Sequence, residues 1–137
     1  MFFNKSVCST RVAFDAVRLR VLTPTTHLVV VPAPGRGKAI QVVSASLKLD
    51  VDKNPFAFTN DLGLITGNIN ISKPQFVMEA PLVNSSFNEW AAFLPPSRAG
   101  SLKAGLPLTF GPLAGANTSF EADGKITLDV AYRVVKA

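Results

Sequence analysis

The chain has 137 residues, of which 47% are hydrophobic and 17% are charged, and its formal net charge is +5. This length predicts one domain with a core large enough to fold without disulfide bonds. The one cysteine, Cys8, excludes an intrachain disulfide and a cysteine-based metal site. No apolar run approaches the ~20 residues that span a membrane, and the opening residues lack the order of a signal peptide. We therefore expect a soluble protein made in a cytoplasm.

Basic residues are spread along the chain, apart from the pairs Arg18/Arg20 and Arg36/Lys38, and they are not interleaved with aromatic residues. Such interleaving is typical of surfaces that bind nucleic acid. The charge pattern therefore indicates no specific nucleic-acid partner. A surface poor in charge suits a subunit that packs against neighbouring proteins.

The segment 1–11 places two aromatic residues, Phe2 and Phe3, ahead of a polar stretch. Chain ends stay disordered unless they dock. We therefore predict an N-terminal arm that reaches a neighbouring subunit, with a frayed terminus as the alternative. The remaining residues, 12–137, are expected to form one domain, and its first strand is predicted at 12–22 from alternating apolar and polar residues.

Residues 34–38 form a glycine-rich loop after a short apolar strand predicted at 27–31. A phosphate-binding P-loop needs four residues between its first Gly and the Gly-Lys pair, then a Ser or Thr. Here the spacing is wrong, and Ala39 follows Lys38 where the hydroxyl should stand. The loop therefore predicts a tight turn between two strands and no nucleotide site.

The segment 38–51 predicts a long strand, because its residues alternate between an apolar and a polar face. Weaker strand signals follow at 56–72. The residues assigned to the apolar face of the long strand are Val43, Ala45, Leu47, Leu49 and Val51.

One segment breaks the strand pattern and predicts a short helix at about 87–94. Ser86 and Glu89 have the spacing of a capping box. The apolar residues that follow lie at helical spacing and end before two prolines. Trp90 and Phe93 are interpreted as core residues at one end of the domain.

The clearest strand signal closes the chain, where residues 125–137 alternate after an Asp-Gly turn. Residues 106–110 are interpreted as the partner strand of this last segment. Roughly seven or eight strands separated by turn residues predict an all-β fold. We expect an antiparallel β-sandwich or jelly roll with one short helix.

The titratable residues form no catalytic pattern. His27 is the one histidine of the chain, and no nucleophile motif accompanies it. Asp50 and Asp52 could bind calcium or serve a glycosidase. Lys48 and Lys53 flank this pair, however, and a solvated turn explains it more simply. We expect no enzymatic activity, no cofactor and no metal site.

The chain carries Ala-Pro-Gly-Arg-Gly-Lys-Ala-Ile at 33–40 and an Asp-Gly turn with a terminal strand at 123–135. In this order the two elements resemble those of small virion proteins from tailed bacteriophages. The resemblance covers the outer two-thirds of the chain, and the stretch 55–105 lies outside it. It implies a small β-sandwich, often trimeric, that sits on the phage head and clamps neighbouring capsomers.

The resemblance therefore implies a capsid decoration (cement) protein on the capsid surface of the virion. Its partners would be the major capsid protein and further copies of itself in a homotrimer. The candidate contacts are Phe2 and Phe3 in the arm, and Arg36 and Lys38 in the loop, which could instead be a solvated hairpin tip.

Two other functions stay open at this stage. The chain could be a tail or head-completion subunit, or a carbohydrate- or receptor-binding β-sandwich module. The binding module would need exposed aromatic residues, for which Trp90 and Tyr132 are the candidates, although Tyr132 is expected in the core.

Overall fold

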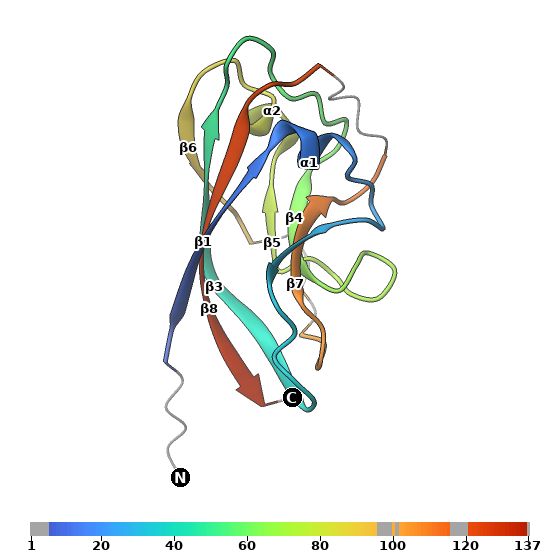
Figure 1. Ribbon diagram of the computed structural model, residues 1–137. Helices are drawn as coiled ribbons and strands as arrows, with labels where there is room; N and C mark the ends of the chain where they lie inside the picture. Colours follow the sequence, from blue (N-terminus) through green and yellow to red (C-terminus); the bar gives the residue numbers. More distant parts are fainter. Residues whose placement is uncertain (1–5, 96–99, 101, 116–120, 137) are drawn as a thin grey trace.

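A computed structural model describes residues 6–95, 100, 102–115 and 121–136. The strands form two four-stranded antiparallel sheets that pack face to face (Figure 1). The first sheet has the order β1 (Cys8–Asp15), β8 (Lys125–Lys136), β3 (Lys38–Asp50) and β6 (Glu89–Ala92). The second has the order β2 (Leu28–Val31), β7 (Leu108–Pro112), β4 (Leu62–Thr66) and β5 (Phe76–Met78).

Four antiparallel strand pairs define the topology, namely β1 with β8, β2 with β7, β3 with β6 and β4 with β5. Each pair joins a strand from the first half of the chain to one from the second half, in nested order. The chain is thus one long hairpin wrapped around a core, which is the jelly-roll arrangement. The prediction of an all-β sandwich or jelly roll is confirmed.

The core lies between the two sheets and is built from the inward-facing side chains of both. The rings of Phe93 and Phe110 meet edge to face there, with centroids 6.1 Å apart. The largest fully buried side chains are Phe14, Phe56, Phe110, Leu19, Ile40, Leu47, Leu49, Leu62, Leu64, Ile65, Met78 and Leu108. This continuous apolar layer holds the two sheets together.

Two short helices, α1 (Ala16–Arg20) and α2 (Ala80–Val83), lie in connections between strands. Neither coincides with the predicted helix. No helix within the described ranges is both long and apolar enough to cross a membrane.

The first strand is shorter than the predicted 12–22, because β1 ends at Asp15 and α1 follows it. The Asp15 carboxylate accepts the backbone amide of Arg18 at 3.0 Å and caps the helix. Ala16 and Leu19, three residues apart, are buried on one side of this single turn. Over five residues, the alternation of apolar and polar residues did not distinguish a strand from a single helical turn.

The helix predicted at about 87–94 is wrong, since this segment contains strand β6. Trp90 lies opposite Lys48 of β3 in a ladder of four residue pairs. Pairing with the free edge of β3 satisfies the backbone groups of both segments, and it outweighs the local capping signal. Phe93 is buried as predicted, whereas Trp90 is half exposed.

Strand β3 carries a bulge between Val42 and Ser44, where it pairs with β8. A bulge inserts one residue and reverses the facing of the strand beyond it. Val43 is consequently exposed, and its predicted place on the apolar face is wrong. The residues that do face the core lie on either side of the bulge: Ile40, Val42, Ala45, Leu47 and Leu49.

The last strand, β8, pairs with β1 and β3. The segment 106–110, interpreted as its partner, overlaps β7, which pairs with β2 and β4 in the opposite sheet. That interpretation is wrong, because a jelly roll pairs the last strand with the first.

Candidate docking surface

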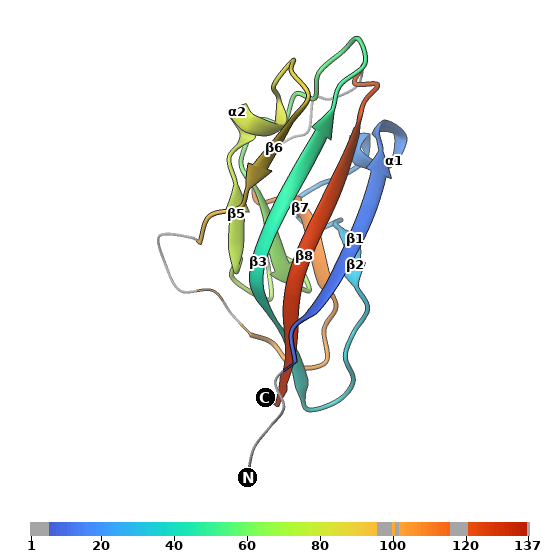
Figure 2. The same cartoon turned by 90° about the vertical axis from the view of Figure 1, so that its left-hand side faces the viewer.

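The first sheet turns one face toward the core and the other toward solvent. We call the solvent-facing side the outer face, and Figure 2 views the sheet from that side. Residues directly opposite one another in a ladder point to the same side of a sheet. The registers therefore define the outer face. Its central residues are Ser9, Arg11, Ala13, Ser44, Ser46, Lys48, Trp90, Ala92, Thr127, Asp129 and Ala131.

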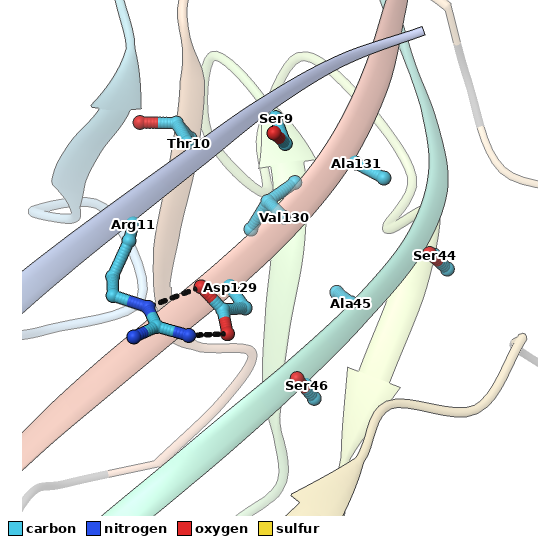
Figure 3. A pocket seen from close by; sticks show the side chains of 9 residues that line it. All are labelled: Ser9, Thr10, Arg11, Ser44, Ala45, Ser46, Asp129, Val130 and Ala131. Carbon is cyan, nitrogen blue, oxygen red and sulfur yellow. Dashed lines mark hydrogen bonds and ion pairs between the residues drawn. The ribbon is translucent and has the colours of Figure 1, made fainter.

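Most of these side chains are small, and they leave a shallow depression of about 680 Å³ over the middle of the sheet (Figure 3). One row across the strands consists of Ser9, Ala131 and Ser44. The next row includes Asp129 and Ser46, with Arg11 at its β1 end. The floor of the depression thus offers hydroxyl groups and methyl groups, with charge along one side.

That charge belongs to a bidentate ion pair between Arg11 and Asp129. The Arg11 Nε donates to Asp129 Oδ1 at 2.7 Å, and Nη2 donates to Oδ2 at 2.6 Å, as drawn in Figure 3. The hydrogen bond from Arg11 holds the pKa of Asp129 below its usual range, and the same bond raises the pKa of Arg11. Because the two charges satisfy each other, they add no net charge to the outer face.

Trp90 stands beside this pair, with the Arg11 guanidinium carbon 5.8 Å from its ring centroid. Half of the Trp90 surface is exposed (50%), so the ring is available to a partner. Tryptophan and arginine are enriched among the residues that dominate binding energy in protein interfaces. A flat face of small residues around such a pair is suited to docking against another surface.

No protein-family model matches the chain, and no curated protein or solved structure matches it either. The virion role implied by the resemblance therefore stays a prediction.

Two of the four candidate contacts named from the sequence lie away from the outer face. Arg36 and Lys38 are exposed at one end of the sandwich, where Lys38 pairs with Lys136 across β3 and β8. Phe2 and Phe3 lie outside the described residues. The expected end of the arm, at residue 11, falls within β1, which pairs with β8 from Cys8 onward.

The glycine loop is the turn that its sequence predicts. Gly35 and Gly37 have φ angles of 103° and 75°, which other residues rarely adopt. The amide of Lys38 donates to the Gly35 carbonyl at 3.3 Å, which closes the turn directly before β3.

His27 occupies a structural position. One ring nitrogen, Nε2, lies 2.8 Å from the Pro112 carbonyl, and Nδ1 lies 3.2 Å from the Thr109 hydroxyl. Burial lowers the pKa of His27, although the bond to Pro112 opposes this effect. Burial therefore favours the neutral ring, and the two contacts tie β7 to the segment before β2.

Asp50 and Asp52 line a shallow depression together with Asp15 and Asp123 at the end of the sandwich opposite Lys38. The Asp123 carboxylate accepts the backbone amide of Asn54 at 2.9 Å, and this bond is the main cause of its lowered pKa. Among the described residues, no group of three His, Cys, Asp or Glu side chains is placed to hold a metal ion.

Sequence reasoning missed Arg11 and Asp129, and it assigned Trp90 to the core. Alternation in the last strand placed Asp129 on a polar face, whereas Arg11 was assigned to the end of the N-terminal arm. What brings them together is the pairing of β1 with β8 and of β3 with β6. Strand register between distant segments leaves no local signal in the sequence.

Proposed function

We propose that the chain is a non-enzymatic structural subunit of a bacteriophage virion, a capsid decoration protein that binds the outside of the head through its outer face. The observation that carries this proposal is the half-exposed Trp90 beside the internally paired Arg11 and Asp129, on a sheet face of small residues. Because Arg11 and Asp129 are paired with each other, docking here leaves neither of them as an isolated buried charge. Such a surface binds protein rather than reacting with a substrate.

The fold is compatible with this role. Eight-stranded jelly rolls occur in viral capsid proteins, and they also occur in lectins, so the fold does not choose between functions. The proposed partner is the major capsid protein, whose lattice repeats the docking site many times. Repetition on a closed shell lets individually weak contacts sum to firm attachment.

Immunogold electron microscopy of particles from the source lysate, with an antibody to the recombinant chain, tests the proposal. Regular label over the heads is the expected result. Label confined to tails would replace the decoration role with that of a tail subunit. Particles without label would contradict a virion role altogether.

A second candidate is a carbohydrate-binding module, which the exposed Trp90 favours. A tryptophan ring beside hydroxyls and an arginine–carboxylate pair presents both an apolar plane and hydrogen-bonding groups, as sugar recognition requires. Trp90 is the one tryptophan of the chain, so its fluorescence reports on this face alone. A saturable fluorescence change with a panel of sugars would support the binding module, and an unchanged signal would count against it.

A further inference from the structure

Charged residues are separated between the two ends of the sandwich. Strand β3 runs from Lys38 at one end to Asp50 at the other, and its thirteen residues span about 40 Å at about 3.3 Å per residue. Lys136 lies opposite Lys38, and Lys125 lies opposite Asp50, so β8 runs back between the same two ends. Each loop can be assigned to an end by its contacts with these strands.

The Lys38 end, which we call the basic end, gathers loops from both sheets. The Gly105 amide donates to the Lys38 carbonyl at 2.8 Å, which places the 102–107 loop there. The Gln75 side chain bonds Val42 and Ile40, which places the 67–75 loop near the same end. The described basic residues of this end are Arg36, Lys38, Lys73, Lys103, Arg133 and Lys136, and no acidic side chain of the described ranges lies beside them.

The Asp50 end, which we call the acidic end, holds eight of the nine acidic residues of the chain, and the ninth, Asp129, is paired on the outer face. Five basic residues of the described ranges share this end, so the described part of it carries a formal excess of three negative charges. Arg20 donates to the Ala122 carbonyl at 2.6 Å, and Lys48 lies 3.9 Å from Asp50. The acidic residues are Asp15, Asp50, Asp52, Asp61, Glu79, Glu89, Glu121 and Asp123.

The basic end also has an apolar floor. A depression of about 520 Å³ lies between the glycine turn and the last residues of β8, and it is lined by Arg36, Lys38, Lys136 and Val134 among others. The Val134 side chain is 41% exposed there. The Nε of Arg133 is buried without a hydrogen-bond partner in the described part of the chain. Apolar area surrounded by charge is the composition of a docking surface.

We infer that the basic end of one copy of this chain binds the acidic end of a second copy, so that copies associate end to end. Within one molecule the two ends are about 40 Å apart, and charges attract weakly beyond the Debye length of about 8 Å at physiological salt. The opposite charges therefore cannot neutralise each other inside one copy. A second copy brings them into contact, and it supplies the acidic surface that the basic end lacks.

Such a contact joins two different surfaces, so its repetition builds a closed ring or an open row rather than a two-fold dimer. The outer face stays free in either arrangement, because it lies along the side of the sandwich between the ends (Figure 2). The inference does not rest on the proposed virion role, and it is tested in solution without particles.

Sedimentation velocity of the full chain tests the inference through two charge-reversed variants. Arg36→Glu with Lys38→Glu lowers the formal charge of the basic end from six positive charges to two, and Asp52→Lys with Glu121→Lys changes the acidic end from three negative charges to one positive charge. Each variant alone is expected to associate about tenfold or more weakly than the natural chain. Mixing the two is expected to restore association, because acidic ends then meet basic ends again.

Lys53→Glu with Lys125→Glu is the matched control, since it changes the net charge as much as the basic-end variant does. Both residues lie at the acidic end, so association is expected to persist in this control. The natural chain is expected to associate about tenfold or more weakly at about 0.5 M salt than at about 0.02 M salt. A monomeric natural chain at low salt, association that ignores salt, or a mixture that stays monomeric would overturn the inference.

Discussion

The two sheets of this jelly roll differ in what lies against their outer sides. In the second sheet, every residue of β4 and β7 is buried, so these strands are covered on both faces. In the first sheet, β8 has buried residues only at alternating positions over its first half, and its other side forms the outer face. One sheet is a closed layer, and the other presents a broad surface to a partner.

Glycines show how closely the second sheet is covered. A Cβ at Gly63 would lie 2.7 Å from Leu113 Cδ2, and a Cβ at Gly111 would meet the ring of His27. The outer face of the first sheet carries Ser44 and Ala131 at comparable central positions, above an open depression. Small residues thus make room for packed neighbours in one sheet and leave a shallow hollow in the other.

The largest effect is expected where both sheets meet in the core. Phe110→Ala removes a fully buried ring and its edge-to-face contact with Phe93, and it should lower the free energy of unfolding by about 3–5 kcal/mol. Phe87→Ala is the control, because that ring is 75% exposed, and a change of about 0.5 kcal/mol or less is expected. Chemical denaturation measures both, and equal losses would contradict the assigned core.

A methyl group added to each sheet sharpens the comparison. Gly111→Ala forces the His27 ring away from β7, and we expect a loss of about 1–3 kcal/mol. Ser44→Thr adds a methyl group to the exposed face, and we expect a change within about 0.5 kcal/mol. Denaturation midpoints that shift alike would show that the second sheet is not covered as described.

The pH dependence of the unfolding free energy tests the burial of His27, whose ring covers β7 at Gly111. Burial lowers the folded-state pKa of His27 below the ordinary value of 6.5, so the folded state favours the neutral ring. This contribution is full above pH 6.5 and is lost as the pH falls from there toward the lowered pKa. The unfolding free energy should therefore fall between pH 7.5 and pH 5.5, and His27→Gln should flatten that slope. If the substitution left the pH dependence of the unfolding free energy unchanged, this would contradict the burial of the His27 ring.

The smallest effect is expected on the outer face. Asp129→Asn removes the ion pair with Arg11, but both side chains are solvated, so the unfolding midpoint near neutral pH should scarcely move. The lowered pKa of Asp129 means that its small contribution is present above about pH 4 and is lost as the pH falls through the lowered value. A large loss of stability in this variant would show that the pair supports the fold rather than a docking surface.

The same contrast explains what could be predicted from the sequence. In β3 and β8 one face is bare, so apolar and polar residues alternate, and both strands were predicted close to their observed bounds. In β4 and β7 both faces are covered, so alternation is absent and the signals were weak or wrongly partnered. Alternation of apolar and polar residues indicates a strand with one exposed face, and it is absent where a strand is buried on both faces.

The remaining errors come from interactions between distant segments. The capping signal at Ser86 predicted a helix, but the segment pairs with β3 as strand β6 instead. The bulge at Val43 depends on the register between β3 and β8. The outer-face cluster of Arg11, Asp129 and Trp90 unites strands far apart in the chain. The chemistry of each residue could be read locally, but their proximity follows from the jelly-roll register alone.

The proposed virion role and its docking through the outer face are tested most directly by co-sedimentation with phage particles that lack the protein. Trp90→Ala and Ala131→Arg should each weaken binding by about tenfold or more, because one removes the exposed anchor and the other fills the depression. Phe87→Ala truncates an exposed aromatic ring that is not among the residues defining that face, so this variant should bind like the natural chain. Equal binding by all of these variants, or no binding by the natural chain, would contradict the account.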